Sequence, residues 1–128
     1  MKNVKLFSIL TIILLAVSCK KKDVNPNLPV ANFTADNDTI PYGIGSNLVF
    51  NFTNTSSNAT TYRWDFGGGY SATTTNGYIS YTSADLTDFF TMVTLSGTNY
   101  FSNQIKLIAK NGTDSAVITK TVVIIEEL

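Results

Sequence analysis

Short segments of β-branched and aromatic residues, separated by clusters of Asn, Gly, Ser and Asp, make up the chain from Val30 onward. In residues 48–52, 62–66 and 105–109, an apolar side chain occupies every second position. Successive side chains of a strand point to opposite faces of a sheet, so this alternation gives each segment one apolar face. Apolar residues at helical spacing occur only in the N-terminal stretch. The pattern therefore predicts an all-β sandwich or barrel.

Seven strands are expected within one domain that covers residues 30–128. They are residues 30–34, 47–54, 60–66, 78–82, 89–95, 104–110 and 115–125. About seven short strands with turn residues between them are typical of an antiparallel immunoglobulin-like β-sandwich. A chain of 128 residues has room for one such core.

Charge and composition exclude several classes of function. From Val30 onward four basic residues oppose eight acidic ones, whereas a domain that binds nucleic acid needs a basic surface. The chain has no histidine and a single cysteine, Cys19, so a Ser-His-Asp or Cys-His site and the usual zinc sites cannot form. We therefore expect no nucleic-acid partner, no enzymatic activity and no cofactor.

The start of the chain has the organisation of an export signal. Lys2 and Lys5 precede an apolar stretch, residues 6–17, as in the positive and hydrophobic regions of signal peptides. As a helix this stretch would be roughly 18 Å long, and the hydrocarbon core of a bilayer is about 30 Å thick. Residues 1–18 are therefore predicted to be a cleaved signal peptide and not a membrane span.

The end of this stretch, Leu15-Ala16-Val17-Ser18-Cys19, resembles the lipobox of bacterial lipoproteins. The resemblance implies lipid attachment at Cys19, and several acyl chains anchor a protein stably. Residues 19–29 would then be the lipidated cysteine and a flexible tether. An ordinary secretory signal is the alternative.

Lysines at positions 20–22 follow Cys19 directly. They resemble the charged tether of surface-directed lipoproteins in some Gram-negative bacteria, which implies the outer membrane and an outward-facing domain. A solvated linker whose lysines lie against anionic head groups is the alternative. We expect a protein that is lipid-anchored in the cell outer membrane and exposed at the surface.

Residues 50–67 carry the most informative motif. A polar corner, residues 53–58, separates two apolar strands, and the second strand ends in Trp-Asp-Phe-Gly at positions 64–67. This order closely resembles the PKD (polycystic kidney disease) domain. A weaker resemblance over residues 105–112 and the last strand extends it to roughly residues 30–125. The resemblance implies an immunoglobulin-like sandwich and an extracellular setting in which such domains contact proteins or polysaccharides.

Two features depart from that family. Gly68 stands where the family usually has the aspartate of Gly-Asp-Gly, which removes a side-chain acceptor from the turn. Residues 81–105 form a longer segment than usual and contain the apolar run 89–95, which we interpret as an extra or lengthened edge strand. The strand order there stays open, and Tyr100 and Phe101 are expected either in the core or on the surface.

Two carboxylate pairs, Asp36 with Asp38 and a second at positions 85 and 88, are candidates for hydrolysis or for a metal. Their Ser, Thr and Asn neighbours are typical of turns that bond their own backbone. Calcium near Asp36 and Asp38 stays open, although the other ligands of a calcium loop are missing. Thr39 and Ser115 lie in Asp-Ser/Thr-aliphatic triplets similar to a bacterial O-glycosylation signal.

Binding of an extracellular protein or polysaccharide is the expected function, and the membrane is contacted through Cys19. Exposed aromatic side chains would carry the binding. The candidate ligand contacts are Tyr70, Tyr78, Tyr100 and Phe101. The alternative is a non-binding structural spacer or accessory subunit of an outer-membrane complex. The oligomeric state stays open.

Overall fold

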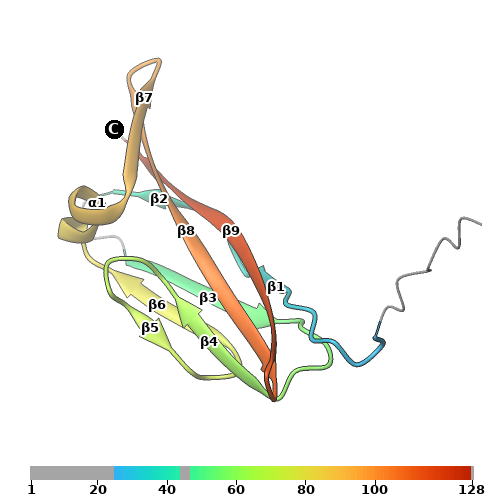
Figure 1. Ribbon diagram of the computed structural model, residues 1–128. Coiled ribbons are helices and arrows are strands. Elements are labelled where there is room, and N and C mark those ends of the chain that lie inside the picture. Colours follow the sequence, from blue (N-terminus) through green and yellow to red (C-terminus); the bar gives the residue numbers. More distant parts are fainter. Residues whose placement is uncertain (1–24, 44–46, 128) are drawn as a thin grey trace, which may run out of the picture.

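The computed structural model describes residues 25–43 and 47–127, which form two packed β-sheets and one short helix (Figure 1). The first sheet has the order β1-β3-β6. It contains β1 (Phe33–Ala35), β3 (Leu48–Asn54) and β6 (Gly77–Tyr81). The second has the order β2-β9-β8-β4-β5, with β7 beside β8. It contains β2 (Thr39–Tyr42), β4 (Thr61–Asp65), β5 (Ser71–Ala72), β7 (Thr91–Leu95), β8 (Thr98–Asn111) and β9 (Asp114–Glu126). The predicted all-β sandwich is confirmed.

The core between the sheets is built around the fully buried Trp64. Its ring stacks on Phe66 and Phe52, with centroids 6.1 and 5.7 Å away, and Phe33 meets it edge-on at 5.1 Å. The indole N–H donates to the carbonyl of Thr74 at 3.0 Å. Every second residue of β3 and of the second half of β8 is buried beside these rings. The apolar faces predicted from the alternation are therefore confirmed.

Tyr81 joins the two sheets without a disulfide. Its hydroxyl donates to the carbonyl of Phe66 at 2.7 Å. The side-chain amide of Asn103 donates to the same carbonyl at 2.8 Å and to the Tyr81 hydroxyl at 3.3 Å. Burial is the main reason why the pKa of Tyr81 lies well above its ordinary value. The phenol therefore stays protonated and holds β6 against β4 and β8.

The helix α1 (Ser83–Phe89) differs from the prediction of an all-β domain, in which no helix follows the N-terminal stretch. Thr82 caps it, because its hydroxyl accepts from the backbone of Asp85, whose carboxylate accepts from the Thr82 N–H at 2.6 Å. Such a capping box satisfies free N–H groups at a helix start. The predicted strand 89–95 therefore begins at Thr91. No helix in the described ranges is long and apolar enough to cross a membrane.

The long β8–β9 hairpin also differs from the expected strand boundaries. β8 begins at Thr98 and not at residue 104, so the expected loop around Tyr100 is part of the strand. β2, a strand that was not predicted, pairs with β9 in parallel, while the other strand pairs are antiparallel. Pro41 makes this strand hard to predict, because a proline within a segment argues against a central strand. β2 lies at the edge of its sheet, where proline is tolerated.

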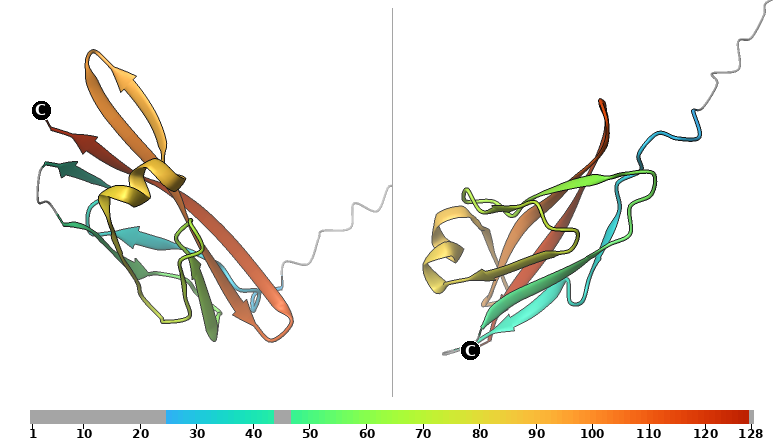
Figure 2. Two further views of the ribbon diagram at one scale, coloured as in Figure 1. Left: turned by 90° about the vertical axis from the view of Figure 1, so that its left-hand side faces the viewer. Right: turned by 90° about the horizontal axis from the view of Figure 1, so that it is seen from below.

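β7 pairs with the first part of β8 and lies at the edge of the sheet. It confirms the expected extra or lengthened edge strand and settles the strand order that had stayed open. Ser96 and Gly97 connect the two strands with φ of 51° and 87°, as a two-residue type I′ hairpin turn requires. This β7–β8 hairpin projects beyond the rest of the sandwich, at the end opposite to the blue segment with which the described chain begins (Figures 1 and 2).

Candidate functional site

An open groove of about 440 Å³ lies along the edge of β4, and we call it the β4 groove. It is lined by Thr60, Thr61, Tyr62, Arg63, Thr73, Thr75, Ile108 and Lys110. β5 pairs only with Trp64 and Asp65, so the preceding residues of β4 have β8 on one side and no strand on the other among the described residues. The groove is therefore open to a ligand along a free strand edge.

Residues 73–76 form the far wall of the groove and are held by three hydrogen bonds. Trp64 donates to the carbonyl of Thr74, and the Thr74 hydroxyl donates to the carbonyl of Asn76 at 2.6 Å. The Asn76 side chain accepts from the backbone N–H of Asn54 at 3.0 Å. Gly77 follows the wall, and a Cβ there would lie 2.9 Å from the Trp64 ring. The wall is thus positioned by the core and is not a loose loop.

Two cations line the groove without ion-pair partners in the described part of the chain. Arg63 pairs in register with Ile108, and Lys110 with Thr61, so their side chains share one face of the sheet. Lys106 on the same face forms a salt bridge with Asp65 at 3.1 Å. Basic side chains are thus concentrated here, although the described residues carry twice as many acidic side chains as basic ones.

Hydrogen bonds hold the Asp65 carboxylate in its charged form beside the groove. The backbone N–H of Gly67 donates to it at 3.1 Å. This bond, followed by the bond and charge of Lys106, lowers the pKa of Asp65 below its ordinary value. Asp65 forms its salt bridge with Lys106, and its charge also interacts with Arg63 at longer range. Arg63 and Lys110 are therefore the cations of the groove that have no salt bridge and face a ligand. The groove therefore suits an anionic ligand.

Threonine hydroxyls supply the polar surface of the groove. Thr60 uses its hydroxyl to donate to the carbonyl of Lys110 at 3.3 Å, while Thr61, Thr73 and Thr75 are exposed. Ile108 is half-buried, pairs in register with Arg63 and lies two residues before Lys110 on β8, so its side chain supplies an apolar surface on the same face. Hydroxyl groups, a planar guanidinium and a small apolar patch are the groups that hold the hydroxyls, carboxylates and C–H faces of sugar rings.

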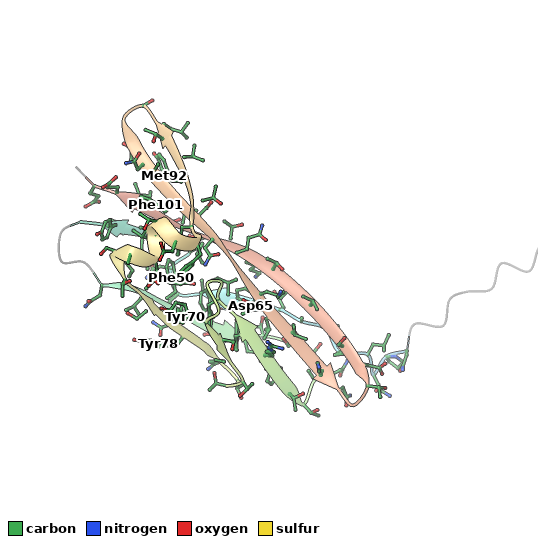
Figure 3. The ribbon with its side chains drawn as sticks, turned by 60° about the vertical axis from the view of Figure 1, so that its left-hand side comes forward. Phe50, Asp65, Tyr70, Tyr78, Met92 and Phe101 are labelled. Carbon is green, nitrogen blue, oxygen red and sulfur yellow. The ribbon has the colours of Figure 1, made fainter. Side chains whose placement is uncertain are left out.

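The four predicted ligand contacts are not brought together. Tyr78 is 60% exposed on the outer face of β6, in the first sheet, and Tyr70 is 42% exposed beside α1 (Figure 3). Tyr100 is half-buried on β8. Phe101 is buried with 7% exposure, so its interpretation as a surface contact is wrong, because β8 turns that side chain into the core.

Tyr70 is partly occupied by contacts within the protein. Its ring meets Phe89 edge-on at 5.8 Å and Tyr81 at 6.4 Å. Its hydroxyl donates to the Asp85 carboxylate at 3.4 Å. None of the four aromatic candidates lines the β4 groove. The signal for the groove was Arg63, which alternates with Tyr62 and Trp64 and had to face outward.

The carboxylate pairs have structural surroundings. Asp85 is buried and completes the capping box of α1, and Asp38 accepts from the Thr39 hydroxyl at 3.2 Å. No group of three or more His, Cys, Asp or Glu side chains that could hold a metal occurs in residues 25–43 and 47–127. Thr39 and Ser115 are exposed on β2 and β9. Residues 1–18 and Cys19 lie outside the described residues.

Two solved structures are similar to this chain. The PKD1 domain of Vibrio anguillarum Epp is 20% identical, with a TM-score of 0.49, over 76% of this chain and 93% of that one. AggA, the major subunit of aggregative adherence fimbriae type I from Escherichia coli, is 14% identical, with a TM-score of 0.34, over 77% of this chain and 93% of that one. No family model and no curated protein matches the chain. These similarities are too low to extend to function.

Proposed function

We propose that this protein is a lipid-anchored, non-catalytic cell-envelope protein whose PKD-like domain binds an extracellular protein or polysaccharide at the cell surface. The β4 groove carries the proposal, because it places two unpaired cations among hydroxyls on an otherwise acidic domain. Of the two ligand classes, an acidic polysaccharide fits this groove best. Its hydroxyls match the threonines and its carboxylates match Arg63 and Lys110.

The expected affinity is modest and depends on salt. The groove is open, so ions screen its charges; the Debye length is about 8 Å at physiological ionic strength. A guanidinium binds a carboxylate through two parallel hydrogen bonds, and a lysine acts as a point charge. Each contact is weak alone, but a repeating ligand that meets many anchored copies on one cell gains avidity.

Binding to a defined ligand tests the groove. Polygalacturonate, which is acidic, should bind the protein, and neutral dextran should not. Arg63→Ala with Lys110→Ala should weaken polygalacturonate binding at least tenfold in calorimetric titration. Lys120→Ala is the control for the loss of a positive charge, because Lys120 does not line the groove, and it should change binding less than threefold. Equal binding of dextran, or an unchanged double variant, would contradict the proposal.

The anchor is tested separately. Cys19→Ala should abolish incorporation of a palmitate analogue and leave the signal peptide uncleaved, because the thiol is the acceptor of the lipid. Protease added to intact cells should remove the wild-type protein if the domain faces outward. Labelled Cys19→Ala protein would contradict lipid attachment. Protection in intact cells, with digestion after the outer membrane is opened, would place the domain in the periplasm.

The alternative, a non-binding spacer or accessory subunit of an outer-membrane complex, predicts a different result. The protein would bind none of the polysaccharides on a glycan array and would co-purify from membranes with the other subunits of its complex.

A further inference from the structure

Two further depressions lie on the face of the second sheet that carries the β4 groove. The middle depression has a volume of about 300 Å³ and is lined by Asp65, Gly67, Gln104, Lys106 and Thr119. The far depression has about 280 Å³ and is lined by Phe89, Thr91, Ser102, Asn103, Gln104 and Thr121. Because Gln104 lines both, the two depressions adjoin each other.

Strand β8, the long strand that runs through the second sheet in Figure 1, aligns these depressions with the β4 groove. Its even-numbered residues from 102 to 110 face outward, because Ile105 and Leu107 between them are buried in the core. Lys110 lines the β4 groove, and Ser102 lines the far depression. Between these two residues β8 covers about 26 Å at about 3.3 Å per residue, which is the length of about five sugar units. We call this line of three depressions the β8 track.

The charge of the β8 track changes along its length. Arg63 and Lys110 in the β4 groove form no salt bridge in the described part of the chain. In the middle depression, Lys106 and Asp65 form a salt bridge at 3.1 Å, so the pair brings no net charge. The residues that line the far depression are all uncharged. A carboxylate is therefore attracted at one end of the track, and uncharged units suit the rest of it.

An aromatic ring forms one wall of the far depression. Phe89 is half-buried, and its ring is held by Tyr70 and Tyr81, whose centroids lie 5.8 Å away in each case. A Cβ on Gly68 would lie 2.6 Å from the Phe89 ring, so the glycine at this turn position leaves room for the ring. The ring lies among the hydroxyl groups of three residues, Thr91, Ser102 and Thr121, and the amide of Gln104. Such a surface suits a neutral sugar, whose C–H face packs on a ring while its hydroxyls bind polar groups.

The backbone of β8 offers little to an extended peptide along the track. β8 pairs with β9 over the whole track, with β4 at residues 106–110 and with β7 at residues 98–102. Between these two pairings, the N–H of Gln104 donates to the side chain of Asn103 at 2.7 Å. An added peptide strand is held mainly by backbone hydrogen bonds to a free strand edge. Recognition along the track therefore depends on side-chain hydroxyls and amides, which favours a ligand rich in hydroxyl groups.

We propose that the β8 track binds about five consecutive units of a polysaccharide in which a uronate is followed by neutral sugars. The uronate carboxylate binds Arg63 and Lys110, and the neutral units extend across the middle depression to Phe89. This inference rests on the proposed function, because the β4 groove is the end of the track that holds the uronate. It adds the length and the composition of the ligand.

Glycans of defined length test this proposal, in calorimetric titrations of the full-length protein in detergent. The probes are xylose chains of one, four or six units that carry one terminal glucuronate. The five-unit glycan should bind at least tenfold more tightly than the two-unit glycan, and the seven-unit glycan should bind within twofold of the five-unit one. Pentagalacturonate should gain less than fivefold over digalacturonate, because its additional carboxylates meet Asp65 in the middle depression and uncharged residues in the far one.

Gln104 gives the matched variant, because its exposed side chain lines only the two added depressions among those described. Gln104→Ala should weaken binding of the five-unit glycan at least fivefold and leave binding of the two-unit glycan within twofold. Asn51→Ala is the control, because it removes an exposed amide from β3 in the other sheet, and it should change neither affinity. Pentaglutamate, an acidic peptide, should bind more weakly than the five-unit glycan.

Several outcomes would overturn the proposal. They are no gain in affinity from two to five units, an equal gain for galacturonate, unchanged binding by Gln104→Ala, and tighter binding of pentaglutamate. The Arg63→Ala and Lys110→Ala double variant separates this proposal from the function of the groove. If it loses the two-unit glycan while added length gives no gain in the wild type, only the track is wrong. If five-unit binding depends on Gln104 and not on the two cations, only the function of the groove is wrong.

Discussion

Truncation of Trp64 to alanine should remove a large part of the stability of the domain. The side chain has no exposed surface, stacks between Phe66 and Phe52 and holds Thr74 through its indole N–H. The substitution therefore opens a cavity at the centre of an aromatic cluster and leaves the Thr74 carbonyl without its donor. It also releases the wall of the β4 groove.

The magnitude follows from these contacts. Truncating a buried tryptophan costs about 3–5 kcal/mol. A domain of about 100 residues has roughly 5–15 kcal/mol in total, so the variant loses between about a fifth of this stability and all of it. A change of this size lowers the melting temperature by about 12–40 °C in a domain of this length. Trp64→Phe keeps an aromatic ring and loses the N–H, so it should cost about 1–2 kcal/mol.

Circular dichroism gives the melting temperature of both variants, and urea unfolding gives their free energy of unfolding, in a chain shortened to begin at Asp23. Fluorescence gives a second measurement on the wild type, because Trp64 is the single tryptophan of the chain. Its native emission should be blue-shifted relative to the protein in denaturant. A Trp64→Ala variant that melts within about 3 °C of the wild type would refute the reasoning.

Three further predictions concern residues next to this core. Gly77→Ala should lower the free energy of unfolding in urea by about 1–3 kcal/mol, because the new Cβ would lie 2.9 Å from the Trp64 ring. Ser80, which is exposed on the same strand, is the control, and Ser80→Ala should change the unfolding free energy little. Equal effects of the two substitutions would count against the close contact. The raised pKa of Tyr81 implies a contribution to the free energy of unfolding that is complete below about pH 10 and declines as pH rises further, because Tyr81 ionises first in the unfolded chain. Tyr81→Phe should show a flatter decline. Parallel curves of unfolding free energy against pH for the two proteins would exclude Tyr81 as the cause. The lowered pKa of Asp65 implies a contribution to the free energy of unfolding that is present above about pH 4 and declines as pH falls below it. Asp65→Asn should flatten this decline by less than about 1 kcal/mol, because the pair with Lys106 is exposed and screened. An unchanged dependence of stability on pH in the acid range would show that Asp65 is not its cause.

Alternation in the sequence predicted the core because it depends on the pleat of a strand and on nothing more distant. Phe50, Trp64 and Leu107 each lie in a run in which polar and apolar residues alternate, and all three are buried. The outward direction of Arg63 follows from the same period. What the alternation could not show is that β5 is two residues long, and this short strand is what leaves the β4 groove open.

The remaining differences have local causes. The helix at Ser83–Phe89 is too short to show a helical period, and Thr82 with Asp85 was the one signal that could have revealed it. Phe101 was uncertain because its neighbours carry no clear alternation. The choice between core and surface was made by pairing with β9, which places Phe101 opposite the buried Ile124.

The parallel pairing of β2 with β9 has a mechanical consequence. β2 lies near the start of the domain and β9 ends it. Traction between the two ends of the chain pulls these strands in opposite directions along their shared ladder, so its hydrogen bonds are loaded in shear and all at once. A ladder loaded in this way resists more force than one that opens bond by bond. Pulling at Asn25 and Glu127 in a single-molecule experiment should therefore require more force than pulling at Thr98 and Glu127, which separates β8 from β9 at their open end one pair at a time. A domain in which β2 and β9 pair in this way is thereby suited to bear tension between its two ends.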